Sequence, residues 1–240
     1  TLMRSSAASD VYKRQRKTGL VEEDTRLSFL GFGTMNGKDG KPFKTREGGV
    51  MRLENLIADI DEEMFTKIVE NRSVRDKDAR DTAKIVGLAA IKYGDLSNQA
   101  TKDYIFDVDR FTSFEGNTGP YILYTIVRIK SILAKYEAQN PGAKAESILP
   151  AASDAEKTLM LELSKYNDVM ESAFAETAPH KICQYIFDLS NAFNSFYHDT
   201  RILAEEDKER QASWIALITL VKRVLEACIQ VLGFEAPERM

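Results

Sequence analysis

The sequence holds few of the residues that build metal sites and covalent cross-links. Only two cysteines, Cys183 and Cys228, and two histidines occur among 240 residues, and no CxxC pair or Cys/His cluster surrounds them. We therefore expect no disulfide framework and no protein-bound metal, and a reducing, cytoplasmic location fits this composition. His180 and His198 lack the serine and acidic partners of a hydrolytic triad, so neither is assigned a catalytic role.

Long apolar runs are also missing. The richest run, 214–225, is interrupted by Lys222 and Arg223, whereas roughly 18 consecutive apolar residues are needed to cross a bilayer. We therefore expect no membrane-spanning segment and no membrane partner. Hydrophobic residues still make up 43% of the chain, which is enough to build the core of one large or two modest domains.

Excess positive charge is absent from the chain as a whole but present in one segment. The formal net charge of -4 argues against a protein that binds nucleic acid over its whole surface. Between Gly31 and Arg52, however, five bases stand against two acids. The bases are Lys38, Lys41, Lys44, Arg46 and Arg52, and the acids are Asp39 and Glu47.

Residues 1–15 contain no apolar core of a signal peptide. Their arginine and serine content faintly resembles a transit peptide, but the segment that follows does not suit the start of a mature chain. We interpret 1–15 as a non-native leader and leave it out of the expected fold.

The order of apolar periodicities predicts a short α/β part followed by helices. Leu27–Phe32 is a short apolar run ending at glycines, which indicates a buried strand, and 34–49 is a glycine-rich surface loop. Helical spacing follows over 53–68, over 85–91 with a stop at Gly94, and over 121–136. After a linker at 139–153, a capping box at 153–156 and then Pro179 open further helices, and the last of them, from Trp214, ends at Gly233.

The glycine-rich loop carries the residues best suited to phosphate chemistry. Lys41 and Lys44 lie three apart, with Thr45 and Arg46 next in the chain, between glycines that let a backbone close over a nucleotide. Cationic groups placed in this way stabilise the charge that develops on a reacting phosphate. The spacing alone equally fits an exposed hairpin whose lysines keep it soluble.

The segment 33–49, GTMNGKDGKPFKTREGG, resembles the KMSKS-type loop in the form used by arginyl-tRNA synthetases. The resemblance implies that Lys41, Lys44 and Thr45 take the catalytic KMSKS roles on the ATP phosphates, with Arg46 beside them. It places Gly33 and Met35 on the adenine side. Pro42 and Phe43 depart from KMSKS itself, which leaves the division of work between the two lysines open.

A second segment, 114–128, resembles the opening of the helical anticodon-binding domain of the same family. The implied tRNA-binding residues are Asn117, Tyr121, Tyr124 and Arg128. Their chemistry is suitable, because unstacked bases are recognised by aromatic stacking and by amide or guanidinium hydrogen bonds. Packing of either tyrosine in the core is the alternative.

The segments 191–197 and 233–240 resemble the closing part of that family. They add Asn191, Tyr197, Arg239 and Met240 as implied tRNA contacts, although the last two also fit an ordinary frayed tail.

The resemblance implies a mainly α chain. The C-terminal remnant of a Rossmann-like class I catalytic domain, 16–105, precedes an antiparallel helical anticodon-binding bundle, 106–240. The implied reaction is ATP-dependent ligation of arginine to tRNA-Arg through arginyl-adenylate, with Mg²⁺ accompanying ATP and a monomer as the expected state. No HIGH-like motif with its two histidines occurs, so we expect a C-terminal fragment that is inactive alone. The alternatives are a stand-alone, non-catalytic tRNA-binding module and a cysteinyl- or methionyl-type relative.

Overall fold

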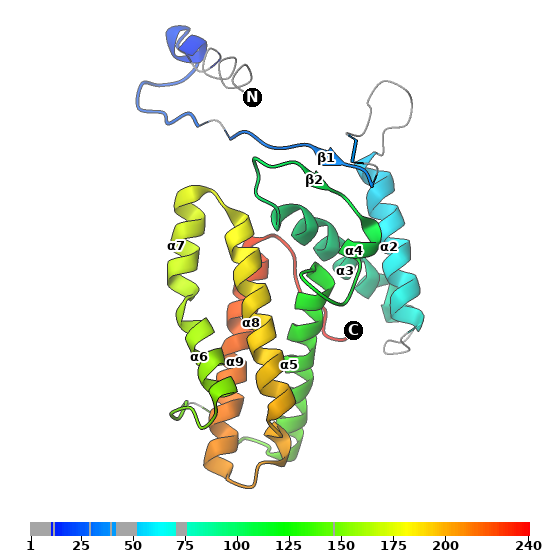
Figure 1. The fold of residues 1–240 in the computed structure, drawn as a ribbon, viewed down its shortest axis with the longest axis vertical. Helices are drawn as coiled ribbons and strands as arrows, with labels where there is room; N and C mark the ends of the chain where they lie inside the picture. The colour runs from blue at the N-terminus through cyan, green and yellow to red at the C-terminus, as the bar shows by residue number, and fades with distance from the viewer. Residues whose placement is uncertain are drawn as a thin grey trace.

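The computed structural model describes residues 11, 13–28, 30–38, 40–41, 52–70, 76–145 and 147–240. The described chain is mainly helical (Figure 1). Its helices are α2 (Leu53–Glu70), α3 (Asp76–Leu96), α4 (Val108–Phe111), α5 (Gly119–Gln139), α6 (Asp154–Ser164), α7 (Tyr166–Glu176), α8 (Pro179–Asp199), the 3-10 turn η1 (Ile202–Ala204) and α9 (Lys208–Val231). Two short strands, β1 (Met35–Asn36) and β2 (Tyr104–Ile105), accompany these helices.

The second half of the chain gathers its long helices side by side. Helix α8 contacts α5, α6, α7 and α9, and α9 also lies against α5 and α6. In Figure 1, α5 and α8 run down the bundle, while the α6–α7 pair and α9 run up it. Most of the contacting pairs therefore have opposite chain directions. Helices α2 and α3 pack on each other, and α3 joins them to the bundle through α5 and α8.

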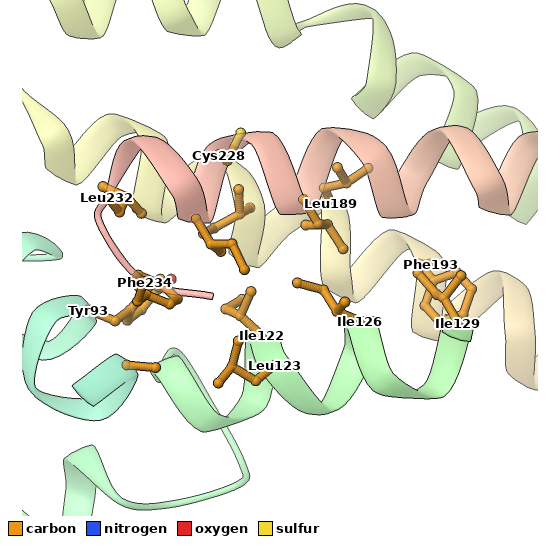
Figure 2. Packing of buried hydrophobic residues seen from close by; sticks show 14 of the residues in the cluster. Tyr93, Ile122, Leu123, Ile126, Ile129, Leu189, Phe193, Cys228, Leu232 and Phe234 are labelled. Atoms are coloured by element: carbon orange, nitrogen blue, oxygen red, sulfur yellow. The ribbon is translucent and has the colours of Figure 1, made fainter. Parts of the chain in front are cut away.

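Apolar residues from α3, α5, α8 and α9 meet in one continuous core (Figure 2). Ile122, Ile126 and Ile129 lie on one stripe of α5 and face Leu189 and Phe193 of α8. Their spacing of three and four residues is the helical period that the sequence displays. This shared core fixes how α5 and α8 lie relative to each other.

Local signals set the ends of the bundle helices. Ser153 caps α6 by accepting the backbone N–H of Glu156 at 3.1 Å, as the capping-box spacing predicts. The Glu156 carboxylate accepts the N–H of Ala152 at 2.9 Å, one residue before the cap. Thr118 caps α5 in the same way, and Pro120 lies in its first turn.

Gly233 ends α9 as expected. Its φ of 83° belongs to the left-handed region, and its N–H donates to the carbonyl of Gln230 while the N–H of Phe234 reaches back to Ile229. These two bonds form a Schellman motif, which satisfies carbonyls that would otherwise lack donors.

The sequence misplaces the end of α3. We expected a stop at Gly94, but the helix continues to Leu96. A Cβ on Gly94 would lie 2.6 Å from the Phe111 ring, so the glycine makes room for that ring against the helix rather than ending it.

The prediction of a buried strand at Leu27–Phe32 is wrong over the described residues. None of 27–28 and 30–32 is in a strand, and Leu30 and Phe32 are exposed. A strand needs a neighbouring strand to pair with its backbone groups. Within the described part of the chain, strand pairing begins only at Met35, which is paired with Tyr104 in the parallel β1–β2 ladder. Thr34–Gly49, expected to be a loop, begins with this short strand, and 42–49 lies outside the described residues.

Both cysteines are buried and free. Burial raises the pKa of the Cys183 thiol and that of the Cys228 thiol to about 12 in each case. No described helix combines the length and apolar character needed to span a membrane.

Candidate nucleic-acid interface and nucleotide loop

Polar and aromatic residues of α5 and α8 form one surface strip, which we call the α5–α8 platform. Helix α5 contributes residues spaced three and four apart, and α8 contributes residues spaced three apart, so each set lies on one side of its helix. The platform consists of Tyr121, Tyr124 and Arg128 from α5 and Asn191, Asn194 and Tyr197 from α8.

Hydrogen bonds tie the two halves of the platform together. The Tyr121 hydroxyl donates to Oδ1 of Asn191 at 2.6 Å. Arg128 Nη1 donates to Oδ1 of Asn194 at 2.6 Å, and Asn194 Nδ2 donates to the Tyr121 oxygen at 2.9 Å. Tyr121 is also half-buried against the Phe187 ring, at 5.8 Å between centroids. Tyr121 is therefore held by contacts within the protein.

Arg128 lies between two tyrosine rings. Its guanidinium carbon is 4.7 Å from the centre of the Tyr124 ring and 5.3 Å from that of Tyr197. The two tyrosines remain 41% and 39% exposed, so neither is a core residue. Tyr197 is also stacked on Phe193 at 6.0 Å, which supports its ring from the core side. The result is a cationic, aromatic surface of the kind that accepts unstacked bases.

Asn194 is the platform residue that the sequence reasoning did not single out. It lies in the segment 191–197, three residues from both Asn191 and Tyr197. That i, i+3 spacing is the signal that could have found it, since it places all three on one face of a helix.

Asn117 lies apart from the platform, just before α5. Its Oδ1 is 2.5 Å from the hydroxyl of Tyr93, which is fully buried and also lies 2.8 Å from the Cys183 carbonyl. Burial raises the pKa of Tyr93, so the phenol keeps its proton. Asn117 thus joins the start of α5 to α3 and α8.

The C-terminal tail is anchored rather than frayed. Lys130 Nζ contacts the Ala236 and Pro237 carbonyls at 3.5 and 3.4 Å, and it lies 2.6 Å from Glu238. The hydrogen bond from Lys130 lowers the pKa of Glu238.

The tail and the platform lie on different sides of α5. Lys130 is two residues beyond Arg128, or about 200° around the helix. Arg239 is exposed and Met240 is half-buried against the core. The recorded contacts therefore do not bring Arg239 and Met240 to the platform.

The nucleotide loop is described only at its root. The N–H of Gly37 donates to the Lys41 carbonyl at 3.0 Å, and the N–H of Gly40, which has a φ of 72°, donates to the Gly37 carbonyl at 2.9 Å, so turn-type hydrogen bonds join Gly37 to Gly40 and Lys41. Lys41 is exposed. The other predicted loop residues, Lys44, Thr45 and Arg46, lie outside the described residues.

An ion-pair cluster ties this root to the start of α4. Lys38 Nζ lies 2.5 Å from Asp109 and 3.1 Å from Asp107, the residue that caps α4. Hydrogen bonds to Asp109 and Asp107 raise the pKa of Lys38. Partial burial pushes the pKa of Asp107 upward, but the hydrogen bonds from Lys38 and from the backbone N–H of Arg110 outweigh it and hold that pKa below its usual value.

Gly33 and Met35 line a groove of about 320 Å³ beside the loop root, together with Tyr104. A Cβ on Gly33 would lie 2.1 Å from the Lys102 carbonyl oxygen, so only glycine fits there. The Gly33 N–H donates to Ala100 at 2.7 Å, so it is already satisfied. Met35 and Tyr104 give the groove apolar and aromatic surface, and Asn98, Gln99 and Lys102 add polar residues to its lining.

Among the described residues, no three His, Cys, Asp or Glu side chains lie together in a geometry that could hold a metal ion.

Comparison with known proteins matches the N-terminal and the C-terminal half of the chain to one family model each. Residues 4–108 match the catalytic-domain model of class I (R) tRNA synthetases, and 122–240 match the DALR anticodon binding domain. The chain is similar to the arginine–tRNA ligase of Agathobacter rectalis, with 62% identity over 96% of this chain and 40% of the relative. It is also similar to that of Alkaliphilus oremlandii, with 56% identity over 96% of this chain and 39% of the relative.

The fold is also similar to that of a solved structure, the arginyl-tRNA synthetase of Thermus thermophilus, with a TM-score of 0.76 and 26% sequence identity. The superposition covers 88% of this chain and 35% of the Thermus thermophilus chain. The chain thus spans about 40% of the length of the curated relatives that it matches. Two adjoining family models, sequence identity across nearly the whole chain and a shared fold all agree: this chain belongs to the arginyl-tRNA synthetase family.

Proposed function

We propose that this chain provides the ATP-closing loop and the anticodon-reading helices of an arginine–tRNA ligase. The reaction is the ATP-dependent joining of arginine to tRNA-Arg through arginyl-adenylate. The observation that carries the proposal is the α5–α8 platform, in which a guanidinium is held between two half-exposed tyrosine rings.

The platform suits a single-stranded anticodon better than a duplex. Splayed bases stack on aromatic or guanidinium planes and are read by hydrogen bonds at their edges. Tyr124 and the exposed part of Tyr197 offer aromatic surface, and Arg128 and Asn191 offer polar groups beside them. Asn117, Arg239 and Met240 would contact other parts of the tRNA, because they lie away from the platform.

The nucleotide loop would act in the step that forms arginyl-adenylate from arginine and ATP. Lys41, Lys44 and Thr45 would contact the ATP phosphates, with Arg46 beside them, and Gly33 and Met35 would lie near the adenine. Cationic groups at these positions favour the transition state, in which charge develops on the α-phosphate. Mg²⁺ would enter bound to the phosphates of ATP.

The finer fold assignment is part of the same proposal. The parallel β1–β2 pair supports a segment of a Rossmann-like catalytic domain over 16–105, and the opposed directions of contacting helices support an antiparallel anticodon-binding bundle over 106–240. We propose that the chain acts as a monomer in the cytoplasm, where buried, free cysteines such as these persist.

Binding of tRNA-Arg tests the proposal. We expect the chain to bind tRNA-Arg more tightly than a non-cognate tRNA, and to lose affinity as salt rises from about 50 to about 200 mM, because phosphate contacts release counterions. Tyr124→Ala should weaken cognate binding, and the matched control Phe174→Ala should not, since Phe174 is exposed on α7, away from the platform. Equal binding of both tRNAs, or affinity that is independent of salt, would contradict the proposal.

Pyrophosphate exchange with arginine, ATP and tRNA-Arg tests the catalytic half. We expect no exchange by the chain alone, because its 240 residues contain no HIGH-type motif to complement the loop lysines. Robust exchange would show that these residues suffice. Cognate binding without exchange is the expected pair of results.

A further inference from the structure

Asn194 occupies the junction between α5 and α8, and its orientation is determined by its partners. Its Oδ1 accepts Arg128 Nη1 at 2.6 Å, and its Nδ2 faces the Tyr121 hydroxyl at 2.9 Å and the Thr125 hydroxyl at 3.3 Å. A guanidinium only donates hydrogen bonds, so the amide oxygen must face Arg128. The nitrogen must then face α5.

These hydrogen bonds form a series in which each residue donates to the next. Arg128 donates to Asn194, Asn194 donates to Tyr121, and Tyr121 donates to Asn191 at 2.6 Å. Thr125, which is fully buried, donates its own proton to the Tyr121 carbonyl at 3.1 Å and so can accept from Asn194. Each of these hydrogen bonds has a defined donor and acceptor, which makes the arrangement specific.

Two constraints act on Arg128. The rings of Tyr124 and Tyr197 flank its guanidinium, and among the described residues the recorded hydrogen-bond acceptor for it is Asn194. The guanidinium carries five N–H donors in a fixed plane, so holding one corner aims the rest. An interaction group that is already ordered loses less entropy when it binds.

We propose that Asn194 is a positioning residue that sets the guanidinium of Arg128 for contact with single-stranded tRNA, without itself having to touch the RNA. This inference rests on the proposed function. It adds a specific residue, and a specific means of pre-organisation, to the platform.

The first test needs no RNA. The heteronuclear ¹⁵N NOE of Arg128 Nε reports how rigid the guanidinium is in the free chain. We expect Asn194→Ala to lower it, Asn194→Asp to retain it because a carboxylate still accepts from Arg128, and the neighbouring control Ser195→Ala to leave it unchanged. A rigid Arg128 in Asn194→Ala overturns the proposal.

The second test is a double-mutant cycle on binding of an RNA hairpin with the anticodon stem and loop of tRNA-Arg. Arg128→Ala and Asn194→Ala should each weaken binding by roughly tenfold, the effect of one hydrogen bond to a charged group. The double variant should be no weaker than Arg128→Ala, because Asn194 acts through Arg128. Additive losses overturn the proposal.

The outcomes separate this inference from the proposed function. If the wild-type chain does not prefer this hairpin over one with an exchanged loop, the proposed function fails, and the inference fails with it. If Arg128→Ala weakens binding and Asn194→Ala does not, only the inference fails. Should Asn194→Ala fold poorly in a thermal melt, Asn194→Ser replaces it, because the shorter side chain cannot reach Arg128.

Discussion

The bundle of α5–α9 and the segment 11–41 are held in different ways. Helices α5, α8 and α9 each bury a stripe in a shared core, and the side chains of Ile126, Leu189 and Phe193 are fully buried. The described part of 11–41 contains no buried apolar residue, and Leu20, Leu30 and Phe32 are exposed.

Among the described residues, several recorded contacts join the N-terminal segment to the rest of the chain. They include the Gly33–Ala100 and Thr34–Asp103 hydrogen bonds, the two-residue β1–β2 pair, the packing of Met35 and the Lys38 cluster. The platform is therefore fixed by the core of the bundle, whereas the loop root is held by local hydrogen bonds, ion pairs and the packing of Met35.

The largest contrast should come from truncating one aromatic in each region. Phe193→Ala should lower the free energy of unfolding by about 3–5 kcal/mol, since it leaves a cavity in the bundle core. Phe32→Ala should change it little, because that ring is 83% exposed. Urea unfolding measures both, and similar losses would remove the contrast.

A substitution at Gly33 should separate the regions without unfolding the bundle. In Gly33→Ala the new Cβ would clash with the Lys102 carbonyl, a strain of about 1–3 kcal/mol that displaces β1. The N–H groups of Tyr104 and Phe106, which donate to Thr34 and Asn36, should then exchange faster with solvent. Amide exchange by NMR measures this, and bundle amides serve as the internal control. Unchanged protection of these two amides would contradict the account.

The Lys38 cluster should give the smallest effect, and one that depends on pH. Asp107 has a lowered pKa in the folded chain, so its ionised form stabilises the loop root above its unfolded pKa, and this stabilisation is lost as the pH falls through the folded value. Lys38→Met should raise the pKa of Asp107, which a carboxyl-carbon NMR titration can follow. Lys92→Met, which removes a lysine that bonds elsewhere, to the Gly233 carbonyl, is the control. An unmoved Asp107 pKa would show that Lys38 does not hold the loop root.

The helices were predictable because their signals are local. The apolar period over 53–68, the Ser153 cap, Pro179 and the glycine at 233 each act within a turn or two, and the structure follows them. The failures came where distant residues decide. Gly94 accommodates the Phe111 ring from another element, and Leu27–Phe32 is apolar but finds no strand partner among the described residues.

The candidate site divides in the same way. Tyr121, Tyr124 and Arg128 could be singled out from the sequence because they follow a recognisable motif at helical spacing. That Arg128 lies between two rings, and that Asn194 holds it, required α8 to be placed beside α5. The link from Lys38 to Asp109 spans 71 positions and has no sequence signal.

We expect tRNA-Arg to bind over the α5–α8 platform. Hydroxyl-radical footprinting with mass spectrometry tests it directly, because it reports the exposure of individual side chains. Tyr124 and Tyr197 should lose reactivity when tRNA-Arg is added, while Phe174, which is 90% exposed on α7, should keep its reactivity. Protection of Phe174 with unchanged Tyr124 and Tyr197 would contradict this expectation.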